Sequence, residues 1–139
     1  MHDETPIVIA AAVLLNPEGQ MLTVRKRGTT EFMQPGGKID AGETPAEALA
    51  RELDEELGLT LPDVGKISEH GVFHAPAAHQ PGRTVKAHVF AFEHGMPVNA
   101  HGEIEELAWI DPHQPAELPL AALTRDFMLP LARRLTSGA

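Results

Sequence analysis

Three glutamates carry the strongest chemical signal in the sequence. Glu52, Glu55 and Glu56 recur at separations of three and four residues, which places their side chains on one arc of a helix. Carboxylates at this spacing are close enough to ligate one cation or a pair of cations, and without a positive partner they destabilise the helix. Because the chain contains no cysteine, a metal would be held by oxygen or imidazole ligands, which favours hard cations.

The segment that carries these acids has the signals of a helix with defined ends. Thr44 is a typical N-cap residue, Pro45 suits the first helical position, and Glu47 completes a capping box. Gly58 stands where a helix commonly ends. We therefore predict a helix over residues 45–57 that presents the three glutamates on one face.

The other apolar segments predict the sheet and a second helix. Strands are expected over 7–15, 21–24, 66–73, 84–92 and 105–110, the first two as a hairpin. A helix is expected over about 120–135, and Pro130 must kink or divide it. Phe32 and Trp109 are expected in the core. The order β-β-α-β-β-β-α predicts a mixed α/β fold, and a length of 139 residues suits a single domain over 1–139.

The composition limits the partners that such a domain could serve. A formal net charge of −9 argues against long nucleic acid, because that affinity depends on Lys and Arg displacing counterions from many phosphates. A small phosphorylated ligand that carries its own metal ion is compatible with this charge. No apolar run approaches the roughly 20 residues that span a bilayer, and the acidic N-terminus does not resemble a signal peptide. We expect a cytoplasmic protein without membrane contact.

The acids also belong to a longer spaced pattern. Its members are Gly37, Glu43, Arg51, Glu52, Leu53, Glu55, Glu56, Gly58 and Leu59. The pattern resembles the Nudix box at each position that the box specifies. Seven of those positions demand a single residue type, so at roughly 7% each a chance match at a given start is on the order of 10⁻⁸.

Resemblance to the Nudix family implies both a fold and a reaction. The implied fold is an α/β/α sandwich with a central mixed sheet, in which the box forms a loop, a helix and a second loop. The implied reaction is hydrolysis of a pyrophosphate bond in a nucleoside diphosphate linked to a further group, with Mg²⁺ or Mn²⁺ as cofactor. A divalent ion suits this chemistry because it neutralises charge where an acidic site meets a pyrophosphate.

The resemblance also implies which groups act at the metal. Ligation is implied for the helix acids and for one backbone carbonyl: Glu52, Glu55, Glu56 and Gly37. The general base differs between family members, and one class takes it from a loop that precedes a Trp-containing strand. Glu103 occupies that position here and is our choice for a further ligand or base, with Glu105 and Glu106 as alternatives.

Two box positions and one glycine are implied to be structural. Glu43 and Arg51 are expected to form an ion pair that fixes the loop on the helix. Gly58 is expected to end the helix through its backbone freedom.

Substrate contacts are less specific in the sequence. Arg25, Lys26 and Arg27 follow the second predicted strand, and the cluster is expected to supply one phosphate contact. Gln34 replaces the Leu or Phe that commonly precedes PGG in the family, so it is either a polar pocket residue or a solvent-facing substitution.

Three functions stay open from the sequence. The compact chain resembles MutT-like hydrolases of nucleoside triphosphates, normal or oxidised, that release a monophosphate and pyrophosphate. One alternative is hydrolysis of ADP-ribose or another sugar nucleotide. Another is a non-catalytic module that senses a nucleotide, although the intact set of acids favours an enzyme. The partner is in each case a small nucleotide, and both a monomer and a homodimer are compatible with the sequence.

Overall fold

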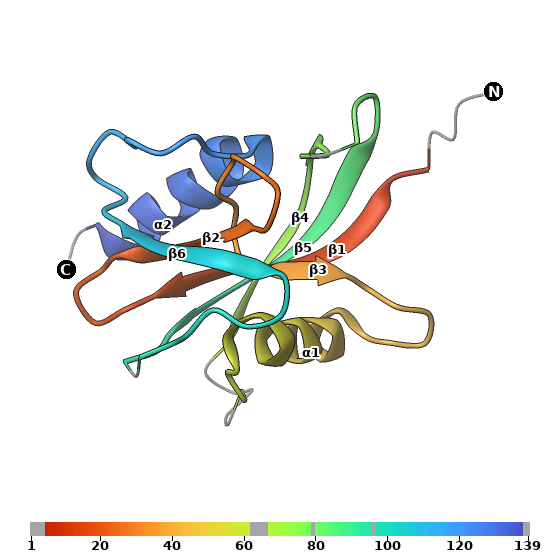
Figure 1. The fold of residues 1–139 in the computed structure, drawn as a ribbon, viewed down its shortest axis with the longest axis horizontal. Coiled ribbons are helices and arrows are strands. Elements are labelled where there is room, and N and C mark those ends of the chain that lie inside the picture. The colour runs from red at the N-terminus through yellow and green to blue at the C-terminus, as the bar shows by residue number, and fades with distance from the viewer. Residues whose placement is uncertain (1–4, 62–66, 79, 96, 138–139) are drawn as a thin grey trace.

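The computed structural model describes residues 5–61, 67–78, 80–95 and 97–137 of the chain. Its elements in chain order are β1 (Ile7–Leu15), β2 (Met21–Lys26), β3 (Gly36–Lys38), α1 (Pro45–Leu57), β4 (Ser68–Pro76), β5 (Thr84–Glu93), β6 (Ile104–Ile110), the π-helix η2 (Thr124–Met128) and α2 (Leu129–Thr136). The strands form one sheet, and α1 and α2 lie on its opposite sides (Figure 1). None of the helices in these ranges is long and apolar enough to cross a membrane.

The sheet is mixed because one strand pair is parallel. The strand order is β4-β5-β1-β2-β6, and β3 pairs separately with β1. β1 and β5 run parallel over the whole of β1, whereas the other pairs are antiparallel. The predicted hairpin is present, with Leu15 opposite Met21.

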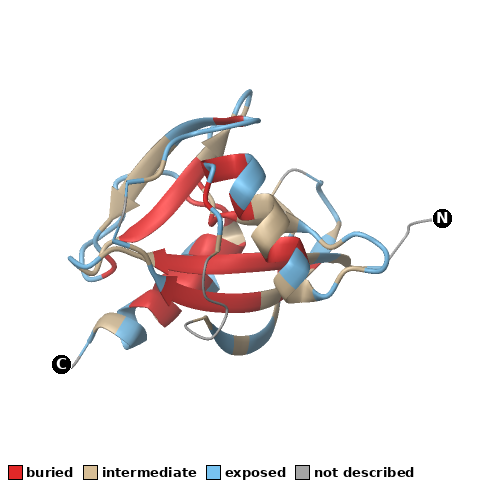
Figure 2. Cartoon of the chain, turned by 90° about the horizontal axis from the view of Figure 1, so that it is seen from below, coloured by how far each residue is buried: buried red, intermediate tan, exposed pale blue. Residues whose placement is uncertain are grey.

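The alternation of side chains along β1 supplies both cores of the sandwich. Ala11 and Val13 face the core that the C-terminal helix covers, whereas Ala10, Ala12 and Leu14 face the core that α1 covers. All five are fully buried. Figure 2 shows buried residues running continuously along the central strands and over the inner sides of the helices. The predicted α/β/α sandwich with a central mixed sheet is confirmed.

Both ends of α1 are fixed by local hydrogen bonds. The Glu47 amide donates to Thr44 Oγ1 at 3.1 Å, and the Thr44 amide donates to Glu47 Oε1 at 2.8 Å. At the other end Gly58 adopts φ 63°, and its amide donates to the Asp54 carbonyl at 2.9 Å. The helix bounds agree with the prediction because these signals are local in sequence.

The strands differ from the prediction at several ends. β3 was not predicted, since it has three residues and begins with two glycines. β2 continues to Lys26, β4 continues to Pro76, and Ile104 belongs to β6. The predicted start at Lys66 lies outside the described residues. Phe32 is buried as expected, whereas Trp109 is only partly buried against the core under α1.

The C-terminal helix changes type near Pro130, where a kink or division was predicted, but the chain stays helical. The π-helix η2 continues directly into α2. The amide of Leu129 donates to the Thr124 carbonyl five residues earlier, which defines the π-helix. Pro130 follows directly and has no amide hydrogen to donate to the preceding turn. The wider turn therefore lies next to the proline, and its first residue, Thr124, is fully buried.

Candidate active site

The predicted metal-binding glutamates meet at an open groove between α1, β3 and the loop before β6. Its empty volume, open solvent included, is about 1120 Å³. The lining residues are Lys26, Gly37, Lys38, Asp40, Glu52, Glu55, Glu56, Gly102 and Glu103. The structure thus brings the three helix acids, Gly37 and Glu103 to one surface.

Glu56 is the most buried carboxyl group of the groove. It exposes 6% of its surface, and its Oε1 accepts a hydrogen bond from the Gly36 amide at 3.0 Å. Burial raises the pKa of Glu56 to about 7, against the lowering effect of the Gly36 amide and of Lys26. A carboxylate in this environment lacks a full counter-charge, which a cation in the groove would supply.

Glu52 is held by the residue that precedes it. Arg51 Nη1 donates to Glu52 Oε1 at 2.9 Å, and the Glu52 side chain is 16% exposed. Burial raises the pKa of Glu52, although Arg51 opposes the rise. Gly37 lies directly opposite: a Cβ atom there would be 2.5 Å from the Glu52 carboxyl carbon. The absence of a side chain at position 37 therefore lets the strand approach the carboxylate.

Arg51 also ties the box loop to α1. Its Nε and Nη2 donate to the two carboxylate oxygens of Glu43 at 2.8 and 2.9 Å, and Nη2 donates to the Lys38 carbonyl at 2.9 Å. The Arg51 guanidinium and the Asp40 amide lower the pKa of Glu43 to about 2. The same hydrogen bonds raise the pKa of Arg51. The loop and helix are thus joined by a bidentate, charge-assisted contact.

Glu55 and Glu103 form the outer wall of the groove. The Glu55 side chain is 59% exposed. Glu103 belongs to a loop that is fixed at both ends, since the Arg27 amide donates to the Glu103 carbonyl and the His101 amide donates to the Glu56 carbonyl, each at 2.8 Å. This loop docks on the end of α1 and carries Glu103 to the groove.

The alternatives to Glu103 have other partners. Glu106 accepts a hydrogen bond from Arg25 Nε at 3.0 Å, and Glu105 lies 3.7 Å from nitrogen atoms of Arg25 and Arg27. Neither acid lines the groove. The pairing of β2 with β6 is irregular between Arg25 and Lys26, so the register of the two strands changes there.

The basic cluster is divided by this arrangement. Lys26 lines the groove, whereas Arg25 and Arg27 are engaged by the acids of β6. Lys38 and Asp40 also line the groove and were not predicted. Both lie just after the glycine pair of the box, and that position was the signal that could have identified them.

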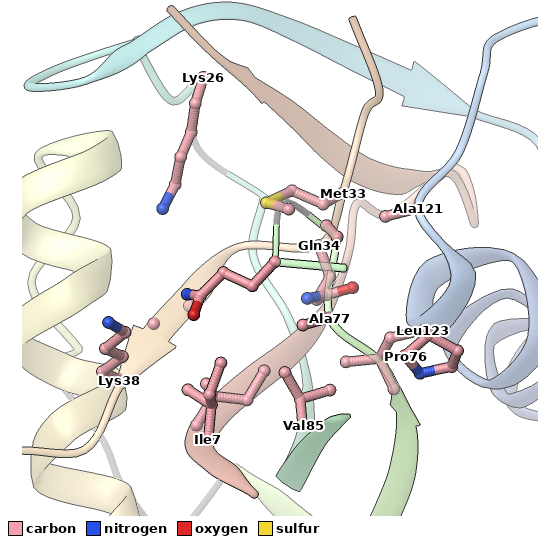
Figure 3. A pocket seen from close by; sticks show the side chains of 15 residues that line it. Ile7, Lys26, Met33, Gln34, Lys38, Pro76, Ala77, Val85, Ala121 and Leu123 are labelled. Carbon is pink, nitrogen blue, oxygen red and sulfur yellow. The ribbon is translucent and has the colours of Figure 1, made fainter. Parts of the chain in front are cut away.

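A second pocket opens beside the groove (Figure 3). Its empty volume, open solvent included, is about 750 Å³, and its walls are mostly apolar, with Ile7, Met33 and Leu123 among them. Lys26, Gly37 and Lys38 line both spaces. Gln34 is buried at this pocket, which decides between its two predicted interpretations in favour of a pocket residue.

The donor set fits a hard divalent cation. The groove offers carboxylate oxygens from four glutamates, without sulfur or imidazole ligands. Within the described ranges, no three acidic or imidazole side chains are gathered closely enough to complete a metal site on their own. Protein hydrogen bonds occupy one oxygen each of Glu52 and Glu56. Such a partial site suits an ion that shares its ligands with substrate phosphates and water.

Comparison with known proteins agrees with this geometry. Residues 5–131 match the family model described as the NUDIX domain. An 8-oxo-dGTP diphosphatase of Haemophilus influenzae is 44% identical over 61 residues, and an RNA pyrophosphohydrolase of Francisella tularensis is 43% identical over 58 residues. These matches cover 41% and 42% of this chain, and 45% and 37% of the relatives. The aligned part is therefore less than half the length of either curated relative.

Solved structures extend the similarity to the whole fold. A MutT Nudix hydrolase from Burkholderia pseudomallei is 25% identical with a TM-score of 0.75, over 91% of this chain and 98% of that protein. The Nudix domain of Shewanella oneidensis NrtR, solved with ADP-ribose, is 16% identical with a TM-score of 0.76, over 96% of this chain and 91% of that domain. At this low identity, the similarity shows the fold alone. The domain match, the fold and the groove lead to one conclusion: the chain belongs to the Nudix family.

Proposed function

We propose that the protein is a divalent-metal-dependent pyrophosphohydrolase of nucleoside triphosphates, normal or oxidised, and that it releases a nucleoside monophosphate and pyrophosphate. The observation that carries the proposal is the groove in which Glu52, Glu55, Glu56 and Glu103 face Lys26. Membership of the Nudix family supports the reaction class. The similarity to an 8-oxo-dGTP diphosphatase supports a triphosphate substrate.

The charges of the groove explain why a metal is part of the proposal. Five carboxylates, one from Asp40 and four from glutamates, line a space that a polyphosphate would enter, so the bare groove repels the substrate. A bound Mg²⁺ or Mn²⁺ supplies positive charge and Lewis acidity toward phosphate and water oxygens. Glu52, Glu55 and Glu56 would hold it, together with the Gly37 carbonyl.

The other side chains of the groove have separate roles in this proposal. Lys26 and Lys38 stand between the groove and the apolar pocket, where they bind phosphate oxygens and hold the chain in line. Glu103 accepts the proton of the attacking water, because its loop carries it to the same groove as the helix acids. Positioning of this kind supplies a large part of the rate in phosphoryl transfer.

The test is release of pyrophosphate or phosphate with Mg²⁺ and then Mn²⁺ across a panel of normal and oxidised nucleoside triphosphates, sugar nucleotides and dinucleotides. We expect Glu56→Gln to abolish turnover while the protein stays folded. The amide oxygen of glutamine can still accept from the Gly36 amide, and a neutral side chain is easier to bury than a carboxylate. We expect Glu103→Gln to slow turnover only partially.

The matched control is Glu106→Gln, which removes a similar carboxylate that pairs with Arg25 outside the groove. Full activity of Glu56→Gln would refute the metal assignment. Preferential cleavage of ADP-ribose would show that the substrate is a sugar nucleotide and not a triphosphate. Tight nucleotide binding without any turnover would show that the protein is a non-catalytic module that senses a nucleotide.

A further inference from the structure

The amide of Gln34 is buried at the pocket beside the groove and is held by a residue from the far end of the chain. Gln34 is 7% exposed, and its side-chain Oε1 accepts from Thr124 Oγ1 at 2.6 Å. The backbone amide of Gln34 donates to the same hydroxyl at 3.2 Å. Thr124 is the first residue of η2 and has no exposed surface.

These two hydrogen bonds determine which way the Gln34 amide faces. The Thr124 hydroxyl already accepts from the Gln34 backbone, so its own hydrogen must go to an acceptor. Because Thr124 is fully buried, water cannot serve, and the structure gives the hydroxyl no other acceptor among the described residues. A reversed amide would replace the only acceptor given for the hydroxyl hydrogen among the described residues by an NH₂ group, and would leave that buried hydrogen unpaired.

With its oxygen engaged, Gln34 presents its nitrogen to the pocket. In the described part of the chain no group accepts a hydrogen bond from Gln34 Nε2. Figure 3 shows the oxygen of this amide on the side of the C-terminal helix and its nitrogen toward the pocket. A donor nitrogen at the wall of an open pocket can donate to an acceptor on a ligand that fills the pocket.

The lining of the pocket suits an apolar heterocycle that is joined to phosphates. Ile7, Met33 and Val85 give it apolar walls, and Lys26 and Lys38 line the passage to the acidic groove. A nucleotide with its phosphates in the groove would therefore direct its base into this pocket. In this placement, an exocyclic substituent at the edge of the base would meet the Gln34 amide.

We propose that the Gln34 amide, oriented by Thr124, selects nucleobases that carry an oxo group at this exocyclic position over bases that carry an amino group there. An oxo group accepts from Nε2, whereas an amino group would set two donors against each other. The inference rests on the proposed function, since it places the phosphates of the substrate in the groove.

The test compares GTP with the triphosphate of 2,6-diaminopurine riboside, which replaces the 6-oxo group by an amino group. We expect the wild type to prefer GTP by roughly 10–100-fold in kcat/KM, the factor that corresponds to an unpaired buried donor. UTP and CTP make a second pair with an oxo and an amino group at position 4, and the same direction of preference is expected.

Three variants separate this role from simple packing. Gln34→Met keeps the length of the side chain but removes the amide, and Thr124→Val keeps the shape but removes the hydroxyl; both should bring the ratio within about 3-fold of unity. Thr124→Ser keeps the hydroxyl and should retain the wild-type ratio. A purely structural role would lower activity on both substrates and leave their ratio unchanged.

Equilibrium binding of the same pairs, measured by calorimetry with Glu56→Gln, distinguishes this inference from the proposed reaction. A preference for oxo bases in binding without hydrolysis by the wild type would support the inference and refute the proposed function. Hydrolysis with equal rates for both bases, or an unchanged ratio in Thr124→Val, would refute the inference alone.

Discussion

Gly37 and Glu52 approach each other more closely than any side chain at position 37 would allow. A Cβ atom would lie 2.5 Å from the Glu52 carboxyl carbon, so Gly37→Ala must displace this carboxylate. The backbone at Gly37 has no positive φ, so alanine itself is not strained there. We expect a loss of activity of about 100-fold, since small misplacements of catalytic groups have effects of that order. Steady-state kinetics measures it, with thermal unfolding to show that the fold is retained.

Gly95→Ala is the matched control for this substitution. Gly95 also lacks a positive φ, and among the described residues a Cβ atom there would touch Pro17 alone, at 3.4 Å. We expect wild-type activity from the control. Equal activity of both variants would show that the position of Glu52 does not limit the reaction.

At the scale of single residues, the sequence predicted the box acids but not their surroundings. The spacing of Glu52, Glu55 and Glu56 was sufficient because one helix carries all three. By contrast, Lys26 could not be distinguished from Arg25 and Arg27, since their difference comes from ion pairs with a strand that lies far away in sequence. The hydrogen bond between Thr124 and Gln34 could not be predicted for the same reason, since the two residues lie far apart in the sequence.

At the scale of elements, the Glu43–Arg51 pair should make stability depend on pH. The pKa of Glu43 falls from 4.5 to about 2 on folding, so the pair contributes fully above pH 4.5, and its contribution is lost as the pH falls toward 2. Glu43→Gln lacks this contribution. We therefore expect the difference in Tm between wild type and variant to be largest near neutral pH and to shrink below pH 4.5.

Thermal unfolding followed by circular dichroism between pH 3 and pH 7 measures this difference. Glu69→Gln removes the same charge from an exposed position on β4 and leaves the Arg51 contacts intact. It should show no comparable dependence on pH. A constant difference in Tm for Glu43→Gln across the range would contradict the assignment.

Elements whose signals are local were predicted well. α1 was correct at both ends because its capping box and Gly58 lie within one turn of those ends. β3 was missed because three residues with two glycines give no alternation, and its place is set by pairing with β1. Pro130 predicted a disturbance of the last helix, but a π-turn was one of several ways to accommodate it.

At the scale of the whole molecule, the two cores are apolar and need no metal for their packing. We therefore expect EDTA to abolish turnover without unfolding the protein. Mg²⁺ together with a product monophosphate should raise Tm by several degrees, because ligand at 100 times its Kd stabilises the folded state by about 2.7 kcal/mol. Differential scanning calorimetry measures the shift, and Glu56→Gln should reduce it. Loss of the folded state in EDTA alone would contradict this view.

The parallel pairing of β1 with β5 also constrains how the chain can fold. Ile7 lies opposite Val85 and Leu15 opposite Glu93, so the central strand finds this neighbour in the distant second half of the sequence. Contacts of such high sequence separation slow folding, because a long loop must close before they form. During synthesis on the ribosome, β1 cannot pair with β5 until β5 has emerged from the exit tunnel. Until then, the edge of β1 that β5 will cover stays accessible to chaperones.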